Sequence, residues 1–187
     1  MTESSPGPDR LLTREDSVLL LIDFQERLLK AMADKDRVLE NAVRLARFAN
    51  LARLPVLVTE QDNLGDTVPE LAAELERAEK FGKIYFDCLA EEDFRARLGL
   101  LGRRTLIIAG LEAHICVAQT GISALEDRYL VHVVGDAVAS RHPDNRRTAL
   151  DRLRQAGAVI TSTEMAIYEI LRRAGTEEFK ETLPLVK

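Results

Sequence analysis

The chain has 187 residues, of which 46% are hydrophobic, enough for one substantial core and too few for two well-packed domains. Its 26 basic and 31 acidic side chains give a net charge of −5. Adjacent basic residues occur only as three scattered pairs and form no block, which argues against a nucleic-acid partner. No apolar run approaches the ~20 residues that a membrane helix needs, so we expect no membrane partner.

The N-terminal composition and the cysteine content indicate a cytoplasmic protein. The first ten residues lack the apolar core of a signal peptide. Two cysteines far apart in the sequence, Cys88 and Cys116, suggest neither a disulfide framework nor a structural zinc site, so reduced thiols are expected. Residues 1–12 are predicted to be an N-terminal tail, disordered where Ser, Pro and Gly dominate, and residues 13–187 to be one domain.

Predicted strands and helices alternate along the chain. Short apolar runs predict strands at residues 18–22, 56–59, 106–109, 131–134 and 158–160. Helices are predicted at residues 37–54, 67–78, 91–98, 115–125, 145–156 and 165–174. Residues 80–89 form a less regular stretch, residues 135–140 a polar exit from a strand, and residues 179–186 a tail that packs on the domain or on a neighbouring subunit. The alternation predicts a single parallel sheet with helices on both faces.

Cys116 is the first candidate functional residue. An apolar strand ends at Gly110, and helical spacing then begins near Ile115, which places Cys116 in the first turn of a helix. Free N–H groups and the positive end of the helix dipole favour a thiolate there. In an open α/β sheet, ligands bind at this carboxyl end of the strands. Because free cysteine is more often a small buried hydrophobe, the stretch alone leaves both interpretations open.

Asp23 and Lys83 are candidates to act with Cys116. Asp23 directly follows the apolar residues 18–22, so it either emerges at the end of the strand or has a charged partner. A carboxylate can take the proton of a thiol, and an ammonium group lowers the pKa of the thiol. Spacing alone does not bring the three residues together, and other acids and lysines, such as Lys80, stay possible.

Motifs along most of the chain point to one family. They are Leu-Leu-Ile-Asp-Phe-Gln at 20–25, Lys-Ile-Tyr-Phe at 83–86, Gly-Leu-Glu-Ala-His-Ile-Cys-Val-Ala-Gln-Thr at 110–120 and Asp-Ala-Val-Ala-Ser-Arg at 136–141, followed by Gly157-Ala158 and Thr163-Glu164. From about residue 16 to residue 174, the chain resembles the isochorismatase-like cysteine hydrolase superfamily, which also contains the nicotinamidases.

The resemblance implies a fold and a catalytic apparatus. The fold would be α/β, a three-layer, Rossmann-like arrangement with a six-stranded parallel sheet. The triad would be Asp23, Lys83 and Cys116. A cis peptide between Leu111 and Glu112 would aim the backbone N–H of Glu112, with that of Cys116, into an oxyanion hole.

Departures from the family pattern narrow the expected function. Nicotinamidases carry an Asp-x-His metal segment after the second strand, where this chain has Thr-Glu-Gln-Asp-Asn at 59–63 and only three histidines in all. We therefore expect no metal and no other cofactor. Isochorismatases proper act on a vinyl ether without using the cysteine, so the presence of Cys116 favours acyl chemistry. The expected activity is hydrolysis of the C–N bond of a small amide through a thioester, by a homo-oligomer.

Several roles stay open at this level. Weaker candidates for the substrate pocket are Phe24, Gln25, Gln61, Tyr85 and Phe86, because aromatic residues in such positions are as often core. The Glu112 side chain and His114 could belong to the site or could serve only packing and hydrogen bonding.

The competing interpretation is a non-enzymatic scaffold on the same fold, or a redox-active protein. In the redox case Cys116 would be an oxidisable thiol, and Cys88 its resolving partner. Cys88 would otherwise be structural or would line the pocket.

Overall fold

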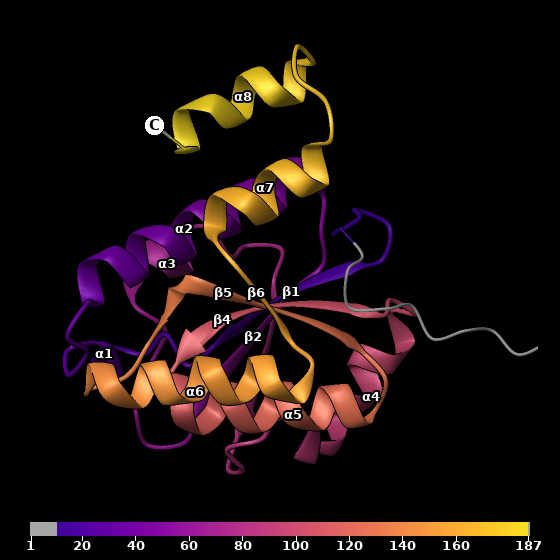
Figure 1. Ribbon diagram of the computed structural model, residues 1–187. Coiled ribbons are helices and arrows are strands. Elements are labelled where there is room, and N and C mark those ends of the chain that lie inside the picture. The colour runs from indigo at the N-terminus through magenta and orange to yellow at the C-terminus, as the bar shows by residue number, and fades with distance from the viewer. Residues whose placement is uncertain (1–10, 187) are drawn as a thin grey trace, which may run out of the picture.

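The computed structural model describes residues 11–186, and its centre is a six-stranded sheet in which every neighbouring pair is parallel (Figure 1). The strand order is β3-β2-β1-β4-β5-β6. The strands are β1 (Ser17–Ile22), β2 (Val56–Gln61), β3 (Glu79–Lys83), β4 (Thr105–Leu111), β5 (Leu130–Ala139) and β6 (Val159–Thr161). The α-helices are α1 (Glu26–Leu29), α2 (Lys35–Ala52), α3 (Pro69–Ala72), α4 (Glu92–Leu100), α5 (Ala118–Glu126), α6 (Pro143–Ala156), α7 (Thr163–Leu171) and α8 (Glu177–Val186).

Helices cover both faces of the sheet, as predicted. Figure 1 shows α2, α7 and α8 on one side and α4, α5 and α6 on the other. The alternation of side chains along β1 explains the two layers: Leu19 and Leu21 pack in one hydrophobic cluster, and Val18, Leu20 and Ile22 pack in the second. All five side chains are at most 1% exposed, and each contributes roughly 1.5–3 kcal/mol to stability through burial.

The prediction of an irregular stretch at residues 80–89 is wrong at its start, because residues 80–83 belong to β3 (Glu79–Lys83). This strand lies at the edge of the sheet and pairs only with β2. Most of its side chains are exposed or half-buried, and Lys83 alone is buried. An edge strand with this burial carries no apolar run, so sequence periodicity could not reveal it.

The predicted polar exit at residues 135–140 is also wrong, because β5 continues to Ala139. Its register against β4 shifts in this part: Ile108 pairs with Val133, whereas Gly110 pairs with Val138. The polar residue within the shifted segment, Asp136, accepts hydrogen bonds from the backbone N–H and the hydroxyl of Thr163, at 2.8 and 3.0 Å. The polar sequence thus serves an irregular strand rather than a loop.

Both ends of the described chain pack on the core. The predicted tail at 179–186 belongs to α8, whose Phe179, Leu185 and Val186 contact the cluster beneath α2 and α7. The predicted disordered N-terminal tail lies mostly outside the described residues. Leu12, however, is 1% exposed and its N–H donates to Glu169 at 2.9 Å, so the last residue of the predicted tail packs on the domain.

Two further findings concern the helices. The helix predicted over residues 67–78 is reduced to α3, four residues that begin with Pro69. Among residues 11–186, no helix has both the length and the apolar character needed to cross a bilayer.

Candidate active site

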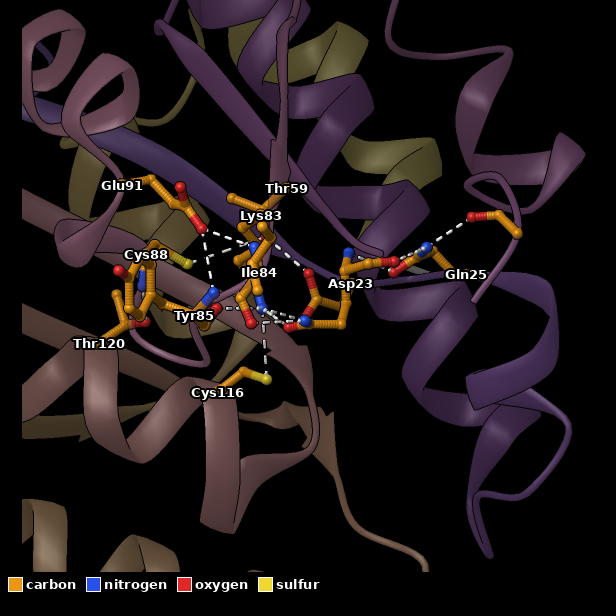
Figure 2. A network of polar contacts seen from close by, with 12 residues as sticks. Asp23, Gln25, Thr59, Lys83, Ile84, Tyr85, Cys88, Glu91, Cys116 and Thr120 are labelled. Atoms are coloured by element: carbon orange, nitrogen blue, oxygen red, sulfur yellow. Dashed lines mark hydrogen bonds and ion pairs between the residues drawn. The ribbon is translucent and has the colours of Figure 1, made fainter. Parts of the chain in front are cut away.

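Asp23, Lys83 and Cys116 meet at the carboxyl edge of the sheet. Asp23 directly follows β1, Lys83 is the last residue of β3, and Cys116 lies in the turn after β4. Because these strands are parallel, their carboxyl ends lie at one edge, where open α/β sheets bind ligands. Figure 2 shows the three side chains pointing toward one another from these separate elements.

Asp23 is turned into the site by its backbone. Its φ of 55° lies in the left-handed region, which non-glycine residues seldom adopt and which costs of order 1–3 kcal/mol. Its N–H donates to the carbonyl of Thr59 on β2, at 3.1 Å. The Thr59 hydroxyl donates to Asp23 Oδ1 at 2.8 Å. Backbone and side chain of Thr59 together fix the carboxylate.

Lys83 occupies the centre of the polar network in Figure 2. Its Nζ lies 2.7 Å from Asp23 Oδ2, 2.6 Å from Gln61 Oε1 and 3.3 Å from the carbonyl of Tyr85. Cys116 Sγ is 3.5 Å from the same nitrogen. The ammonium group therefore touches both the acid and the thiol.

The environment keeps Asp23 and Lys83 as a charged pair. Neither side chain is exposed. Burial by itself would lower the pKa of Lys83, but the adjacent Asp23 carboxylate outweighs it and raises the pKa. Burial raises the pKa of Asp23, while Lys83 and then Thr59 act in the opposite direction. Asp23 is thus an anion that accepts a proton more readily than an exposed aspartate does.

Cys116 differs from the prediction of a stabilised thiolate. It lies in a π-helical turn, Ala113–Val117, that precedes α5, and it is 5% exposed. Burial first, and the negative charge of Asp23 second, raise the pKa of the Cys116 thiol to about 12. The resting group is therefore a protonated thiol.

The peptide between Leu111 and Glu112 is cis. Within residues 11–186, no backbone hydrogen bond outside the helices and strands has the N–H of Glu112 as its donor. Just before it, β4 passes very close to β1: a Cβ on Gly110 would lie 2.6 Å from the Cβ of Ile22. Glycine at this position lets the two strands approach and sets the place where the Cys116 turn begins.

The weaker pocket candidates divide into three groups. Phe24 is fully buried in a hydrophobic cluster and is a core residue. Gln25 and Gln61 are joined by two hydrogen bonds, from Gln25 Nε2 to the Gln61 carbonyl and from the Gln61 N–H to Gln25 Oε1, at 2.9 and 2.8 Å. Tyr85 and Phe86 are 59% and 51% exposed. Of these five candidates, Gln25 and Gln61 belong to the network around Lys83 through their side chains, and Tyr85 belongs to it through its carbonyl.

A cavity of about 600 Å³ opens beside this network. Gln25, Gln61, Lys83 and Ile84 contribute to its wall. Its other lining residues include four acids, Glu60, Asp62, Asp66 and Glu91.

The sequence does not identify two residues that contribute hydrogen bonds to the site, Thr59 and Glu91. Glu91 Oε1 accepts hydrogen bonds from the N–H groups of Ile84 and Tyr85, at 2.6 and 3.0 Å, and so holds the segment that follows Lys83. Thr59 could have been found from its place at the end of a strand beside Asp23. Glu91 is separated from its partners by a short turn, and no spacing rule reveals it.

The alternative candidates lie outside the triad. Cys88 is fully buried, its Sγ lies 3.9 Å from the Thr59 hydroxyl, and burial raises the pKa of its thiol to about 12. Both cysteines are free thiols. Lys80 pairs instead with Glu60, at 3.0 Å. Within residues 11–186, no group of three His, Cys, Asp or Glu side chains is arranged to hold a metal ion.

Comparison with known proteins identifies the family. The family model of the isochorismatase domain matches residues 17–165. The secreted isochorismatase effector Isc1 of Phytophthora sojae is 38% identical over 182 residues, which cover 94% of this chain and 87% of that protein.

Two solved structures share the fold closely. YcaC from Pseudomonas aeruginosa, with hexane-2,5-diol and covalent acrylamide, is 30% identical, has a TM-score of 0.89, and is matched over 95% of this chain and 92% of its own. The YcaC gene product of Escherichia coli, described as an octameric hydrolase of unknown specificity, is 31% identical, has a TM-score of 0.83, and is matched over 87% and 83%. The chain belongs to the isochorismatase family, whose membership supports a role as a hydrolase.

Proposed function

We propose that the protein is a metal-independent cysteine hydrolase that cleaves the C–N bond of a small amide through a thioester intermediate. One observation carries the proposal: Lys83 Nζ lies 2.7 Å from the Asp23 carboxylate and 3.5 Å from Cys116 Sγ in a buried site. A nucleophile, a proton acceptor and a balancing cation are the groups that acyl transfer through a thiol requires.

The proposed reaction begins with proton transfer from Cys116 to Asp23. As Sγ attacks the amide carbonyl carbon, the thiol proton moves to the carboxylate and the carbonyl oxygen becomes an oxyanion. Lys83 offsets the negative charge that develops in the site. The backbone N–H groups of Glu112 and Cys116 are the proposed oxyanion donors.

The tetrahedral intermediate then collapses by breaking its C–N bond. Asp23 returns its proton to the leaving nitrogen, so that ammonia or an amine departs and a thioester remains on Cys116. A water molecule attacks the thioester carbonyl and gives a proton to Asp23. Breaking the C–S bond releases the acid product, and the proton on Asp23 restores the thiol.

The family comparison gives the proposal further support. The P. aeruginosa YcaC structure contains covalent acrylamide, a small molecule that is both an amide and an electrophile. A covalent adduct with this electrophile supports a nucleophile that a small molecule can reach in that protein. Family membership does not favour the alternative of a scaffold or a redox-active thiol protein.

A screen of small amides tests the function, with released ammonia as the readout. Cys116→Ala should abolish turnover and prevent any acyl adduct, as measured by intact mass after rapid quenching. Cys88→Ala is the matched control, because Cys88 is the other buried thiol, and it should keep most of the activity. Exhaustive chelation should leave turnover unchanged. Loss of turnover that zinc restores would contradict the metal-independent mechanism.

We also propose that the protein forms a homo-oligomer. Ile84, Tyr85 and Phe86 are consecutive and are 76%, 59% and 51% exposed, and monomers seldom leave such a run uncovered. The related E. coli YcaC product is octameric. Light scattering on Tyr85→Ser should report a smaller particle than the parent, whereas Leu100→Ser, at a residue that is 79% exposed on α4, should not. Equal particle sizes for the parent and Tyr85→Ser would contradict an interface at this segment.

A further inference from the structure

The turn that carries Cys116 is tied to the segment after β5 by four hydrogen bonds. The N–H and the Nε of Arg141 donate to Glu112 Oε2 and Oε1, at 2.9 and 3.0 Å. His114 Nδ1 lies 3.0 Å from Ser140 Oγ, and its Nε2 lies 3.3 Å from Asn145 Nδ2. We call these five residues the cross-brace.

Glu112 is the one acidic residue of the cross-brace, and it is buried. Its side chain is 4% exposed, and a carboxylate at that depth needs a cationic partner and hydrogen bonds. Arg141 supplies both, because it places one donor on each carboxylate oxygen. The Arg141 side chain is itself 57% exposed, so its charge reaches the buried carboxylate from the protein surface.

These contacts argue against Glu112 or His114 as a general base. Both oxygens of Glu112 accept hydrogen bonds from Arg141, and both ring nitrogens of His114 have partners in the cross-brace. The polar contact of Cys116 Sγ is with Lys83, which is not part of the cross-brace. The cross-brace holds the backbone between residues 112 and 116, which includes the N–H of Glu112, the proposed oxyanion donor.

We propose that Glu112 and Arg141 form a positioning pair for the oxyanion hole, an inference that rests on the proposed acyl chemistry. The pair has two effects. It holds the Glu112 N–H at a fixed place relative to Cys116, and a displacement of about 1 Å costs roughly 100-fold in rate. Arg141 also neutralises the carboxylate of Glu112, the same residue whose N–H is the proposed oxyanion donor, and an unpaired carboxylate there would oppose the negative charge of the oxyanion.

The charge effect gives a prediction that a purely structural role does not. Arg141→Met keeps the aliphatic stem but leaves the Glu112 carboxylate without its cation. Adding Glu112→Gln removes that charge while one side-chain oxygen remains to accept from the residue 141 N–H. The double variant should therefore acylate faster than Arg141→Met alone, although it carries more substitutions. Arg152→Met is the matched control, since Arg152 is an exposed arginine on α6.

Two reactions of Cys116 separate positioning from simple loss of the nucleophile. Acylation by 4-nitrophenyl acetate passes through an oxyanion. The reaction is measured by the release of 4-nitrophenolate and by the mass of the acetyl adduct. Alkylation by iodoacetamide displaces iodide and forms no oxyanion. At one mildly alkaline pH, Arg141→Met should acylate roughly 10- to 100-fold more slowly than the parent, in line with impaired oxyanion stabilisation. Its alkylation rate should stay within about threefold, since only oxyanion stabilisation is impaired.

The outcomes are distinguishable. If the parent forms no acetyl adduct on Cys116, the proposed function fails. If the parent acylates and Arg141→Met acylates equally fast, only the positioning pair is overturned. Equal loss of both reactions in Arg141→Met would indicate general disruption and would also overturn it. Ethylguanidinium offers a second measurement, because it should restore acylation in Arg141→Ala by refilling the exposed site, and no restoration would count against the charge effect.

Discussion

The buried ion pair between Asp23 and Lys83 leads to a prediction about single and double substitutions. Substituting both residues should restore part of the stability that each single substitution removes, but it should not restore activity. Asp23→Asn leaves the Lys83 ammonium group without its counter-charge, and Lys83→Met leaves the Asp23 carboxylate unpaired. Neither charged side chain has any exposed surface, so water cannot take the place of the lost partner. Breaking such a pair on one side costs roughly 3–5 kcal/mol.

The double variant Asp23→Asn/Lys83→Met removes both charges together. The introduced asparagine can still accept the hydrogen bond that Thr59 gives to Asp23 Oδ1, and the introduced methionine fills the space of the lysine stem. Replacing both members of a buried ion pair with neutral groups is often close to neutral for stability. The double variant should therefore be more stable than either single variant, and as inactive as the worse of the two, since the residues of a catalytic unit are not additive.

Thermal unfolding and turnover measure the two effects side by side. For a chain of 187 residues, a loss of about 3–5 kcal/mol lowers Tm by roughly 6–20 °C in each single variant. Turnover is compared at equal folded fraction, after reversibility has been checked. A double variant whose loss in stability equals the sum of the two single losses would refute the coupling between Asp23 and Lys83.

Three further predictions concern packing, pH and the nucleophile. Gly110→Ala should lower the free energy of unfolding by about 1–3 kcal/mol or more, because its Cβ would lie 2.6 Å from that of Ile22. Gly82→Ala, with open space around its Cβ, should be nearly neutral, and urea denaturation measures both variants. The folded-state pKa of Cys88 is raised from 9.0 to about 12, so its stabilising contribution is present below pH 9 and is lost as pH rises toward 12. The stability advantage of the parent over Cys88→Ala should therefore shrink above pH 9, by up to about 1.4 kcal/mol per pH unit. A difference in unfolding free energy that does not change with pH would contradict the argument from burial. Peptide mapping after iodoacetamide treatment should find Cys116 modified before fully buried Cys88, and the reverse order would count against an accessible nucleophile.

The sequence predicts the interior of the sheet better than its edge. Strands with neighbours on both sides, such as β1 and β4, are buried on both faces, so they read as continuous apolar runs. β3 has one neighbour, and four of its five side chains are exposed or half-buried, which removes the apolar signal. The end of β5 escapes prediction for a related reason, since a shifted register lets polar residues stay within a strand.

The candidate site is only partly visible in the sequence. Asp23 can be selected by a local rule, because an acid that ends an apolar strand needs a partner or an exit. Lys83 can be selected only through a family resemblance, since its meeting with Cys116 depends on the order of strands across the sheet. Gln61 can be named from the sequence only as a weak pocket candidate. The contacts of Thr59 with Asp23 and of Gln61 with Lys83 are not apparent until the neighbours of β2 are known.

The protonation state of Cys116 cannot be read from sequence, and it has the largest consequence for mechanism. The helix dipole is a local feature and favours a thiolate, whereas burial and the charge of Asp23 arise from tertiary structure and prevail. With the pKa near 12, forming the thiolate before attack at neutral pH would cost about 7 kcal/mol. Direct transfer of the proton to Asp23 during attack avoids a free thiolate. In the proposed mechanism, the Asp23 carboxylate, paired with Lys83, is the proton acceptor beside a neutral Cys116 thiol, and the nucleophile forms only as it attacks the carbonyl.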